Sequence, residues 1–284
     1  MSVIQSEKAK KFRALHAGPK AFIFPNPWDA GSARVLAALG FEALATTSAG
    51  FAFSLGRRDG QVTREEALEH CRVIAKATDL PVAADLENCF GDDPKTVAET
   101  IRLAGSTGIV GGSVEDADAN GRIYEFKHAV DRVKAAVESA RALPFPFTLT
   151  ARAENFLHGH EDLDDTIRRL QAFAQAGADV LYAPGLTSLD AIKKVCAAVA
   201  PKPVNVLAGM KGANFPLAEL EAAGARRVSV GGALARAALG ALMSAGREMK
   251  EKGTFGFVDR AAPSAEVNGI MTDRSREAGK RGSD

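Results

Sequence analysis

Short apolar segments alternate with amphipathic segments along most of the chain. The apolar segments have the length of strands and are rich in β-formers or Ala, with turn residues at their ends. We expect about eight strands, at Ala21–Asn26, Ala43–Ser48, Val82–Glu87, Ile109–Asp116, Phe147–Glu154, Val180–Gly185, Val204–Ala208 and Val228–Gly232. Most precede a segment with helical spacing, for example Arg64–Ala77, Pro94–Ala104, Glu125–Arg141, Leu163–Ala176, Leu189–Val199 and Ala233–Lys252. Strand and helix repeated eight times predict an α/β fold, the (β/α)8 TIM barrel, whose usual size is about 250 residues.

An open, doubly wound sheet is the alternative architecture. It would have fewer strands, or a Gly-x-Gly-x-x-Gly fingerprint after the first strand. The residues at 27–33 read Pro-Trp-Asp-Ala-Gly-Ser-Ala instead. The segments before several strands also end in Gly, as at Gly40, Gly177 and Gly224, where Gly can adopt the left-handed C-cap conformation. These recurrent helix ends favour the barrel.

The two ends of the chain differ from this repeat. Ile4–His16 has helical spacing and predicts an N-terminal helix that ends at Gly18. We assign residues 1–262 to a single barrel domain. Residues 263–284 are polar and lack periodicity, so we expect a disordered C-terminal tail.

The charge balance excludes several classes of partner. The chain has 36 Lys and Arg and 35 Asp and Glu, a net charge of +1, which gives no footprint for nucleic acid or an acidic membrane. Cys71, Cys89 and Cys196 are too few and scattered for a disulfide framework, which indicates a reducing compartment. With no apolar run long enough to span a bilayer and no signal core, we expect a cytoplasmic protein.

The stretch Leu80–Gly91 contains the strongest chemical signal. A short apolar run begins at Pro81 and ends in two carboxylates, Asp85 and Glu87. Side chains two apart on a strand point to the same face. Both faces of a parallel sheet are buried, so two like charges there are costly unless a cation or strong donors satisfy them. This cost predicts a metal site.

Several other predicted strands also end in polar residues, where barrels place their chemistry. These residues are Asn26, Trp28, Asp29, Thr47, Ser48, Gly50, Asp85, Glu87, Glu115, Asp116, Arg152, Glu154, Asn155 and Asn205. Mg²⁺, or alternatively Mn²⁺, would satisfy Asp85, Glu87 and Glu115 together. Arg152 would bind a substrate carboxylate. The alternative is that these groups form only ion pairs and helix caps, as Asp93 before Pro94 is expected to do.

Two weaker candidates lie elsewhere. His158 and His160 have the spacing of a metal pair, but a third ligand would have to come from another part of the chain. Cys89 is close to the acids and could be reactive, although a free Cys is more often a small buried apolar residue.

Motifs in consistent order from about Phe12 to Phe257 resemble the isocitrate lyase and phosphoenolpyruvate mutase superfamily. They are Pro25–Ala30, Thr46–Gly50, Gly56–Gly60, Ala84–Glu87, Val114–Asp116, Thr150–Glu154 and Ala176–Asp179. The resemblance implies a Mg²⁺-dependent (β/α)8 barrel that forms a homo-oligomer, a dimer or a tetramer, in which a helix near the carboxyl end is exchanged between neighbours. It also implies making or breaking a bond next to the carbonyl of a small 2-oxo acid, through an enolate of pyruvate or a relative.

We expect three sets of site residues from the resemblance and from the strand-end positions. The catalytic set is Asp59, Glu115 and Arg152. The substrate-binding set is Trp28, Ser48, Ala49, Gly50, Arg152 and Asn205. The metal set is Asp85 as the nearest ligand, with Glu87 and Glu115 acting through bound water.

Two departures from the family pattern bear on the reaction. The family has Asp-x-Asp at the central strand, whereas Glu87 takes the second place here. The lyases that cleave isocitrate or methylisocitrate carry a Lys-x-Cys-Gly loop, and its Cys is thought to act as the acid. Here that place reads Ala117-Asp118-Ala119-Asn120-Gly121-Arg122. The missing acid argues against cleavage of a tricarboxylic acid by that mechanism.

The predicted function is a Mg²⁺-dependent carbon–carbon lyase acting on a small 2-oxo acid or its precursor. Decarboxylation of an oxaloacetate-like substrate is favoured, because it needs stabilisation of an enolate but no lid acid. One alternative is phosphorus–carbon chemistry on phosphonopyruvate, for which Arg57, Arg58 or Lys211 could supply positive charge. A second alternative is a barrel that binds a 2-oxo acid with little catalysis.

Overall fold

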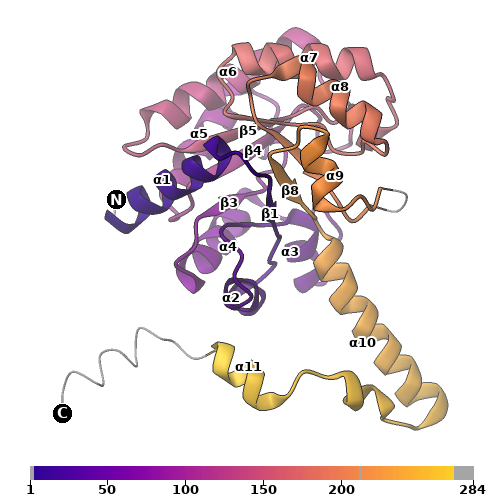
Figure 1. The fold of residues 1–284 in the computed structure, drawn as a ribbon. Coiled ribbons are helices and arrows are strands. Elements are labelled where there is room, and N and C mark those ends of the chain that lie inside the picture. Colours follow the sequence, from indigo (N-terminus) through magenta and orange to yellow (C-terminus); the bar gives the residue numbers. More distant parts are fainter. Residues whose placement is uncertain (1–2, 211–212, 272–284) are drawn as a thin grey trace.

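Eight parallel strands form the centre of the protein (Figure 1). The computed structural model describes residues 3–210 and 213–271. The strands are β1 (Phe22–Phe24), β2 (Leu44–Ala45), β3 (Val82–Ala84), β4 (Gly111–Glu115), β5 (Thr148–Arg152), β6 (Val180–Tyr182), β7 (Val204–Leu207) and β8 (Arg227–Ser229). Their order in the sheet is β1-β8-β7-β6-β5-β4-β3-β2. The Ala45 N–H donates to the carbonyl of Pro25 at 3.0 Å, which brings β2 beside the end of β1 and nearly closes the ring. The predicted (β/α)8 barrel is confirmed.

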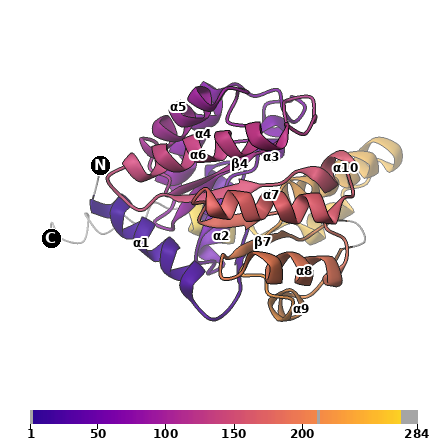
Figure 2. The same ribbon diagram turned by 90° about the horizontal axis from the view of Figure 1, so that it is seen from above.

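The helices that surround the strands are α1 (Val3–Ala17), α2 (Ala30–Ala38), α3 (Ser48–Ser54), α4 (Arg64–Ala77), α5 (Pro94–Gly105), α6 (Phe126–Ala142), α7 (Leu163–Gln175), α8 (Leu189–Val199) and α9 (Leu217–Ala222), with the short 3-10 helix η1 (Asn155–His158) (Figures 1 and 2). Two further helices, α10 (Ala233–Lys252) and α11 (Ser264–Met271), and the 3-10 helix η2 (Gly256–Arg260) follow β8. Helix α5 illustrates why these segments form helices that pack on the sheet. Asp93 caps it by accepting from the Lys95 N–H at 2.8 Å, as expected, and its apolar stripe of Val97, Ile101 and Ala104 is buried.

The register of β4 and β5 positions the site. These strands pair residue by residue from Gly111 opposite Thr148 to Glu115 opposite Arg152. Strands β4 and β5 therefore end with the charged side chains of Glu115 and Arg152 next to each other. A shift by one residue would move both groups to the opposite face of the sheet.

The predicted N-terminal helix is present as α1. Its Phe12 side chain is fully buried and stacks on Phe24 of β1, with ring centroids 5.3 Å apart. Gln5 donates to the carbonyls of Gly105 and Ile109 at 3.0 and 2.9 Å. Helix α1 is thus part of the barrel core rather than a separate arm.

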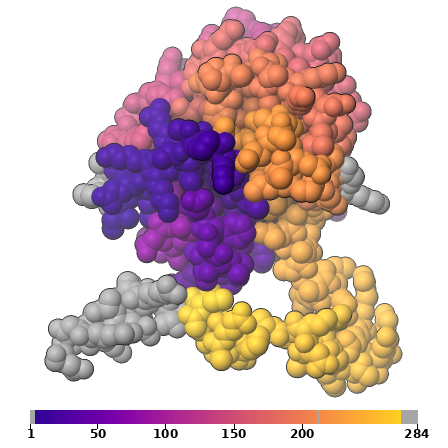
Figure 3. All heavy atoms as spheres, in the orientation of Figure 1, coloured from indigo at the N-terminus to yellow at the C-terminus, as the bar shows by residue number. Residues whose placement is uncertain are grey.

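The chain after β8 leaves the barrel as an arm made of α10, η2 and α11 (Figures 1 and 3). In α10 only Ala235 is buried. Helix α11 returns to α2, where Arg34 Nη1 donates to the carbonyl of Met271 at 2.5 Å. This helix lies at the start of the segment 263–284, and its Val267, Ile270 and Met271 have helical apolar spacing. The rest of that tail, 272–284, lies outside the described residues.

No helix within 3–210 or 213–271 is long and apolar enough to cross a membrane. The arm nevertheless exposes large apolar side chains, namely Leu239, Leu242, Met243, Met249, Phe255 and Val258. Exposed apolar patches of this kind mark sites of association. We propose that the arm contacts a neighbouring copy in a dimer or tetramer.

This proposal predicts an effect of charge on oligomer mass. Leu242 and Met243 are 66% and 53% exposed in the single chain, so the double substitution Leu242→Lys with Met243→Lys should reduce the mass in solution to that of one 29.8 kDa chain. Light scattering measures that mass. Glu251→Lys, which changes charge at the end of the same helix, should leave the oligomer intact. A wild-type protein that is monomeric would contradict the proposal.

Candidate active site

A cavity of about 250 Å³ extends from the carboxyl ends of the strands into the barrel. Its walls come from most of the strands and from the loops that follow them. The polar residues that line it are Asn26, Thr46, Thr47, Ser48, Asp59, Asp85, Ser113, Thr150, Arg152, Tyr182, Asn205, Arg227 and Ser229. This is the end at which barrel enzymes carry out their chemistry.

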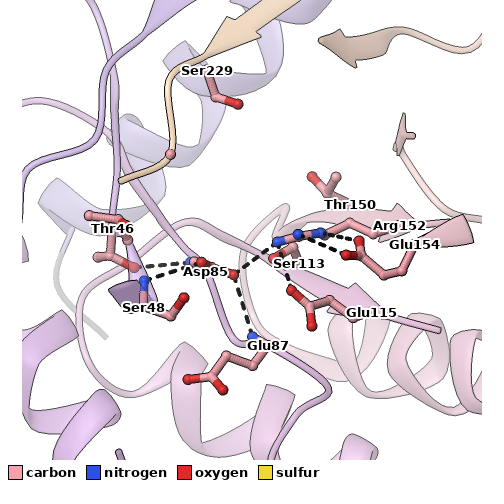
Figure 4. Close-up of polar contacts among 12 residues, drawn as sticks. Thr46, Ser48, Asp85, Glu87, Ser113, Glu115, Thr150, Arg152, Glu154 and Ser229 are labelled. Carbon is pink, nitrogen blue, oxygen red and sulfur yellow. Dashed lines mark hydrogen bonds and ion pairs between the residues drawn. The ribbon is translucent and has the colours of Figure 1, made fainter. Parts of the chain in front are cut away.

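Arg152 lies at the centre of a carboxylate cluster (Figure 4). Its Nη1 atom is 3.1 Å from Asp85 Oδ1 and 2.9 Å from Glu115 Oε1. Its Nε and Nη2 atoms donate to the two carboxylate oxygens of Glu154 at 2.7 and 3.3 Å. Burial lowers the pKa of Arg152, but the charges of Glu115, Glu154 and Asp85 outweigh burial and leave this pKa well above its usual value. The guanidinium is therefore a fixed cation.

A second buried ion pair holds Glu154 in place. The Glu154 N–H donates to Asp116 Oδ1 at 2.8 Å, and Asp116 Oδ2 is 3.1 Å from Arg169 Nη1. Both side chains of this pair are almost fully buried. The predicted strand-end residues Asp116 and Glu154 thus support Arg152 from behind and do not line the cavity.

The acids around Arg152 exceed its single positive charge. Burial, together with repulsion from Asp85 and Asp59, raises the pKa of Glu87 to about 8. Burial also raises the pKa of Glu115, although Arg152 opposes the shift, and burial and the charge of Asp85 raise that of Asp59. Each shift records a carboxylate that lacks enough positive charge nearby. The cluster favours a bound cation.

The predicted metal ligands do not form one set of direct ligands. In the part of the chain that the structure describes, no three His, Cys, Asp or Glu side chains have the geometry to hold a metal ion together. Arg152 stands between Asp85 and Glu115 instead. The residues still fit a hydrated divalent cation, because Mg²⁺ usually binds through one or two carboxylates and keeps several waters. Asp85, which lines the cavity, would hold it directly, with Glu87 and Glu115 acting through water.

Glu87 does not continue strand β3. The strand ends at Ala84, and Glu87 has a φ of 50°, so the alternation that placed Asp85 and Glu87 on one face does not apply. The Glu87 side chain lines a narrow recess beside the main cavity. Figure 4 shows its carboxylate pointing away from Glu115.

The loop after Asp85 is strained and is held by Arg132. Glu87, Cys89 and Phe90 all have positive φ, between 50° and 61°, which is uncommon for residues other than Gly. Arg132 of α6, 1% exposed, donates to the carbonyls of Asn88, Gly91 and Asp92 at 2.6, 2.6 and 2.7 Å. These bonds keep the loop in a conformation that it would not adopt alone.

Cys89 is buried within the same loop. Its thiol is fully buried, and burial raises its pKa to about 12. Cys89 is a packing residue rather than a reactive thiol. His158 and His160 do not line the cavity either.

Three predicted site residues meet at one side of the cavity mouth. Ser48, Ala49 and Asp59 all line it. The Ser48 N–H donates to Asp85 Oδ2 at 3.2 Å, and the nearby Ser48 side chain partly offsets the rise in the pKa of Asp59. The loops after β2 and β3 therefore bring a hydroxyl and two carboxylates together.

Three other predicted substrate-binding residues have different positions. Trp28 and Gly50 do not line the cavity. Gly50 packs so closely that an added Cβ would lie 2.9 Å from Trp28 Cβ, and its place is structural. Asn205 does line the cavity, but its amide donates to Ser229 Oγ at 2.9 Å and accepts from Arg227 Nε at 2.8 Å.

Arg227 also lines the cavity. It is the first residue of β8, so the pattern of polar residues at the carboxyl ends of strands does not point to it. Of the cations suggested for a phosphonate, the two that the structure describes do not line the cavity. Arg57 pairs with Glu66 at 2.8 Å, Arg58 does not line the cavity, and Lys211 lies outside the described residues.

The loop after β4 is short and closed on itself. Asp118 accepts from the backbone N–H groups of Asn120 and Arg122, both at 2.9 Å, and Ala117 pairs with Ile123 across the turn. The loop holds no Lys or Cys. The described chain thus supplies no lid acid at this place.

Fold and site together define a barrel enzyme with a cavity at the strand ends, where Arg152 is paired with three carboxylates. The family model for phosphoenolpyruvate phosphomutase matches residues 12–250. The chain belongs to the isocitrate lyase and phosphoenolpyruvate mutase superfamily, which confirms the resemblance. It is an enzyme, and carbon–carbon cleavage is the activity that its relatives support.

Three relatives illustrate this membership. A crystal structure of a protein from Burkholderia cenocepacia, provisionally described as a lyase or mutase, is 58% identical with a TM-score of 0.93 and covers 96% of this chain and 98% of that one. The 2,3-dimethylmalate lyase of Eubacterium barkeri is 29% identical over 93% of each chain. The oxaloacetate decarboxylase of Bradyrhizobium diazoefficiens is 29% identical over 67% of this chain and 68% of its own.

The role of Arg132 predicts a large loss of stability on substitution. Arg132→Met should lower the free energy of unfolding by about 3 kcal/mol, because three carbonyls of the strained loop lose their donor. Urea denaturation measures the difference. The matched control, Lys134→Met, removes an exposed cation from the same helix and should change stability by less than about 0.5 kcal/mol. Equal effects of the two substitutions would contradict the role given to Arg132.

Proposed function

We propose that the protein is a Mg²⁺-dependent lyase that acts on a small 2-oxo acid or its precursor through a pyruvate-type enolate. Among the candidate reactions, we favour decarboxylation of an oxaloacetate-like substrate. The observation that carries the proposal is the pairing of Arg152 with Asp85 and Glu115 beside a cavity that Asp85 and Asp59 line. The carboxylate of a 2-oxo acid pairs well with a guanidinium, and a divalent cation can polarise the neighbouring carbonyl oxygen.

Each residue of the mouth has a distinct part in this proposal. Asp85 would hold the cation, and Arg152 would contact the oxo acid. The Ser48 hydroxyl and the Ala49 backbone would bind a carboxylate, and Asp59 would lie close to the reacting group. When bound, the cation supplies positive charge beside the oxygen on which negative charge develops.

The closed loop after β4 supports decarboxylation over cleavage that needs an acid. Loss of CO₂ requires stabilisation of the enolate but no proton donor on a lid. The self-bonded turn at Asp118–Arg122 offers neither a Cys nor a Lys. The cavity of about 250 Å³ also suits a small acid.

Phosphorus–carbon chemistry on phosphonopyruvate is the second candidate. The match to the phosphoenolpyruvate phosphomutase model favours it. Against it, Arg57 is paired with Glu66 on the surface, so among the described residues only Arg152 and the deeper Arg227 offer a phosphonate positive charge in the cavity.

The proposal predicts Mg²⁺-dependent release of pyruvate from one of three substrates, oxaloacetate, 2-methylisocitrate or phosphonopyruvate. One pyruvate assay covers decarboxylation, methylisocitrate cleavage and phosphonate hydrolysis. Asp85→Ala should reduce kcat/KM by about 10³-fold, because it removes the proposed cation site.

The control for this assay is Asp131→Ala, which removes an exposed acid on α6 and should leave the rate unchanged. The Asp85→Ala protein also corrects for decarboxylation of oxaloacetate by free metal. If no substrate releases pyruvate, or if Asp85→Ala matches the wild-type rate, the pyruvate-enolate proposal is wrong for these substrates.

A further substitution separates an enzyme from a protein that only binds a 2-oxo acid. Glu115→Gln keeps the size of the side chain and removes one negative charge beside Arg152. We expect kcat to fall about 100-fold while the affinity for oxalate changes less than about threefold. An unchanged kcat would exclude a catalytic role for Glu115, and tight oxalate binding with no turnover in the wild type would favour the binding protein.

A further inference from the structure

Tyr124 connects two buried supports of the candidate active site. One support is the loop 86–92, which carries Glu87. The other is the buried pair of Asp116 and Arg169. Tyr124 is itself buried, does not line the main cavity, and comes at the end of the short loop after β4. Its contacts with both supports indicate a role that its position in the sequence does not reveal.

The Tyr124 hydroxyl bonds to both ends of the strained part of the loop. It donates to Asp92 Oδ1 at 2.5 Å. It also accepts from Asn88 Nδ2, which lies 3.4 Å away. Between these two partners the chain has positive φ at Cys89 and Phe90. One hydroxyl therefore joins the start and the end of a segment that is costly to hold in its shape.

The Tyr124 ring adds a contact with Arg132, which donates to carbonyls of the same loop. The Arg132 Cζ atom lies 4.4 Å from the ring centroid, within the range of a cation–π interaction. Burial, reinforced by the bond to Asp92, raises the pKa of Tyr124 to about 12. The phenol is therefore protonated throughout the neutral range and remains a donor.

The backbone of Tyr124 is fixed by the second support. Its N–H donates to the Asp116 carbonyl at 2.8 Å, and its carbonyl accepts from Arg169 Nη1 at 3.0 Å. The same Arg169 atom lies 3.1 Å from Asp116 Oδ2. Asp116 accepts in turn from the Glu154 N–H, and Glu154 pairs with Arg152. The Tyr124 hydroxyl thus reaches the loop from a buried base that also supports Arg152.

The position of the loop is transmitted to the proposed cation ligands through the backbone. Asn88, which bonds to the Tyr124 hydroxyl, directly follows Glu87. The Glu87 carbonyl accepts from the Glu115 N–H at 3.1 Å. A shift of the loop would therefore move the Glu87 carboxylate and change its spacing from Glu115. These are the two acids that would hold the cation through water.

We propose that Tyr124 is a positioning residue for the cation site, because its hydroxyl holds the loop 86–92 where Glu87 can act on a hydrated divalent cation. This inference rests on the proposed function, in which Asp85 holds that cation. Groups that orient the ligands of a metal commonly affect its affinity without touching it. The loop after β4 would then contribute to the site by ordering its neighbour, although it holds no Lys or Cys.

Removal of the hydroxyl alone tests the role. Tyr124→Phe keeps the ring over Arg132 and deletes the bonds to Asn88 and Asp92. We expect the Kd for Mn²⁺ to rise about 10-fold, the lower end of the effects of removing a group that orients a metal ligand. Electron paramagnetic resonance of free Mn²⁺ with the full chain measures this Kd without turnover. Loss of binding in Asp85→Ala identifies the bound Mn²⁺ as that of the cavity.

Ser139→Ala is the matched control for the loss of a hydroxyl. Ser139 lies on α6, the helix that carries Arg132, and donates to the Ala98 carbonyl of α5 at 2.7 Å. This bond does not involve the loop 86–92. Its removal should leave the Kd for Mn²⁺ unchanged within about twofold. Equal weakening by Ser139→Ala and Tyr124→Phe would show only a general loosening of the fold and would overturn the inference.

A double-mutant cycle assigns the effect to the bond between Tyr124 and Asp92. Asp92→Ala removes the acceptor, and the accompanying loss of charge is common to both halves of the cycle. In the Asp92→Ala background, Tyr124→Phe should change the Kd less than about threefold, against about 10-fold in the wild type. An effect of full size in both backgrounds would overturn the role given to this bond.

A second pair of variants serves if Tyr124→Phe does not fold. Asp92 is exposed, and both Asp92→Asn and Asp92→Ala remove its charge, but only Asn keeps an acceptor for the hydroxyl. The Asn variant should bind Mn²⁺ about fivefold more tightly than the Ala variant. Equal affinities of the two variants would overturn the inference.

The outcomes separate this inference from the proposed function. A wild-type protein that binds Mn²⁺ in the cavity and shows the effect of Tyr124→Phe, yet releases no pyruvate, would support the positioning role and contradict the proposed reaction. An unchanged Kd in Tyr124→Phe would overturn the positioning role alone. A wild-type protein that binds no Mn²⁺ would overturn both.

Discussion

The position of Arg152 within three carboxylates is the constraint on which the candidate active site depends. A guanidinium offers its donors in fixed directions in one plane, so the acids around it can take few arrangements. The register of β4 and β5 places Glu115 beside Arg152, and Asp85 comes directly after the end of β3. Glu154 follows Arg152 by two residues along the chain. The barrel thereby determines the geometry of the mouth, and the buried pair of Asp116 and Arg169 holds it from behind.

The charges of the cavity are distributed unevenly. At the mouth, the carboxylates outnumber the single guanidinium of Arg152, and the raised pKa values of Glu87 and Glu115 reflect that excess. At the floor, Arg227 has no carboxylate partner among the described residues. The excess of carboxylates at the mouth is the physical basis for proposing a divalent cation near Asp85.

The sequence was sufficient to predict the eight-stranded barrel, the acids at the strand ends and Arg152, because hydrophobic periodicity and the position of polar residues carry that information. It was not sufficient for Glu87, since the strand rule fails where the chain turns into positive φ. Asn205 was expected to bind substrate, but its amide is committed to neighbours from distant parts of the chain. Arg227 was missed because its reach across the barrel interior depends on packing, which no local pattern reveals.

The central claim is that Asp85 and Arg152 form a site for a cation and a 2-oxo acid. A crystal structure of the full chain with Mg²⁺ and oxalate, an unreactive mimic of the pyruvate enolate, tests this claim most directly. The account predicts Mg²⁺ about 2.1 Å from an Asp85 carboxylate oxygen. It also predicts oxalate oxygens within hydrogen-bond distance of the Arg152 guanidinium. Oxalate bound outside the cavity, or Mg²⁺ bound away from Asp85, would contradict the account.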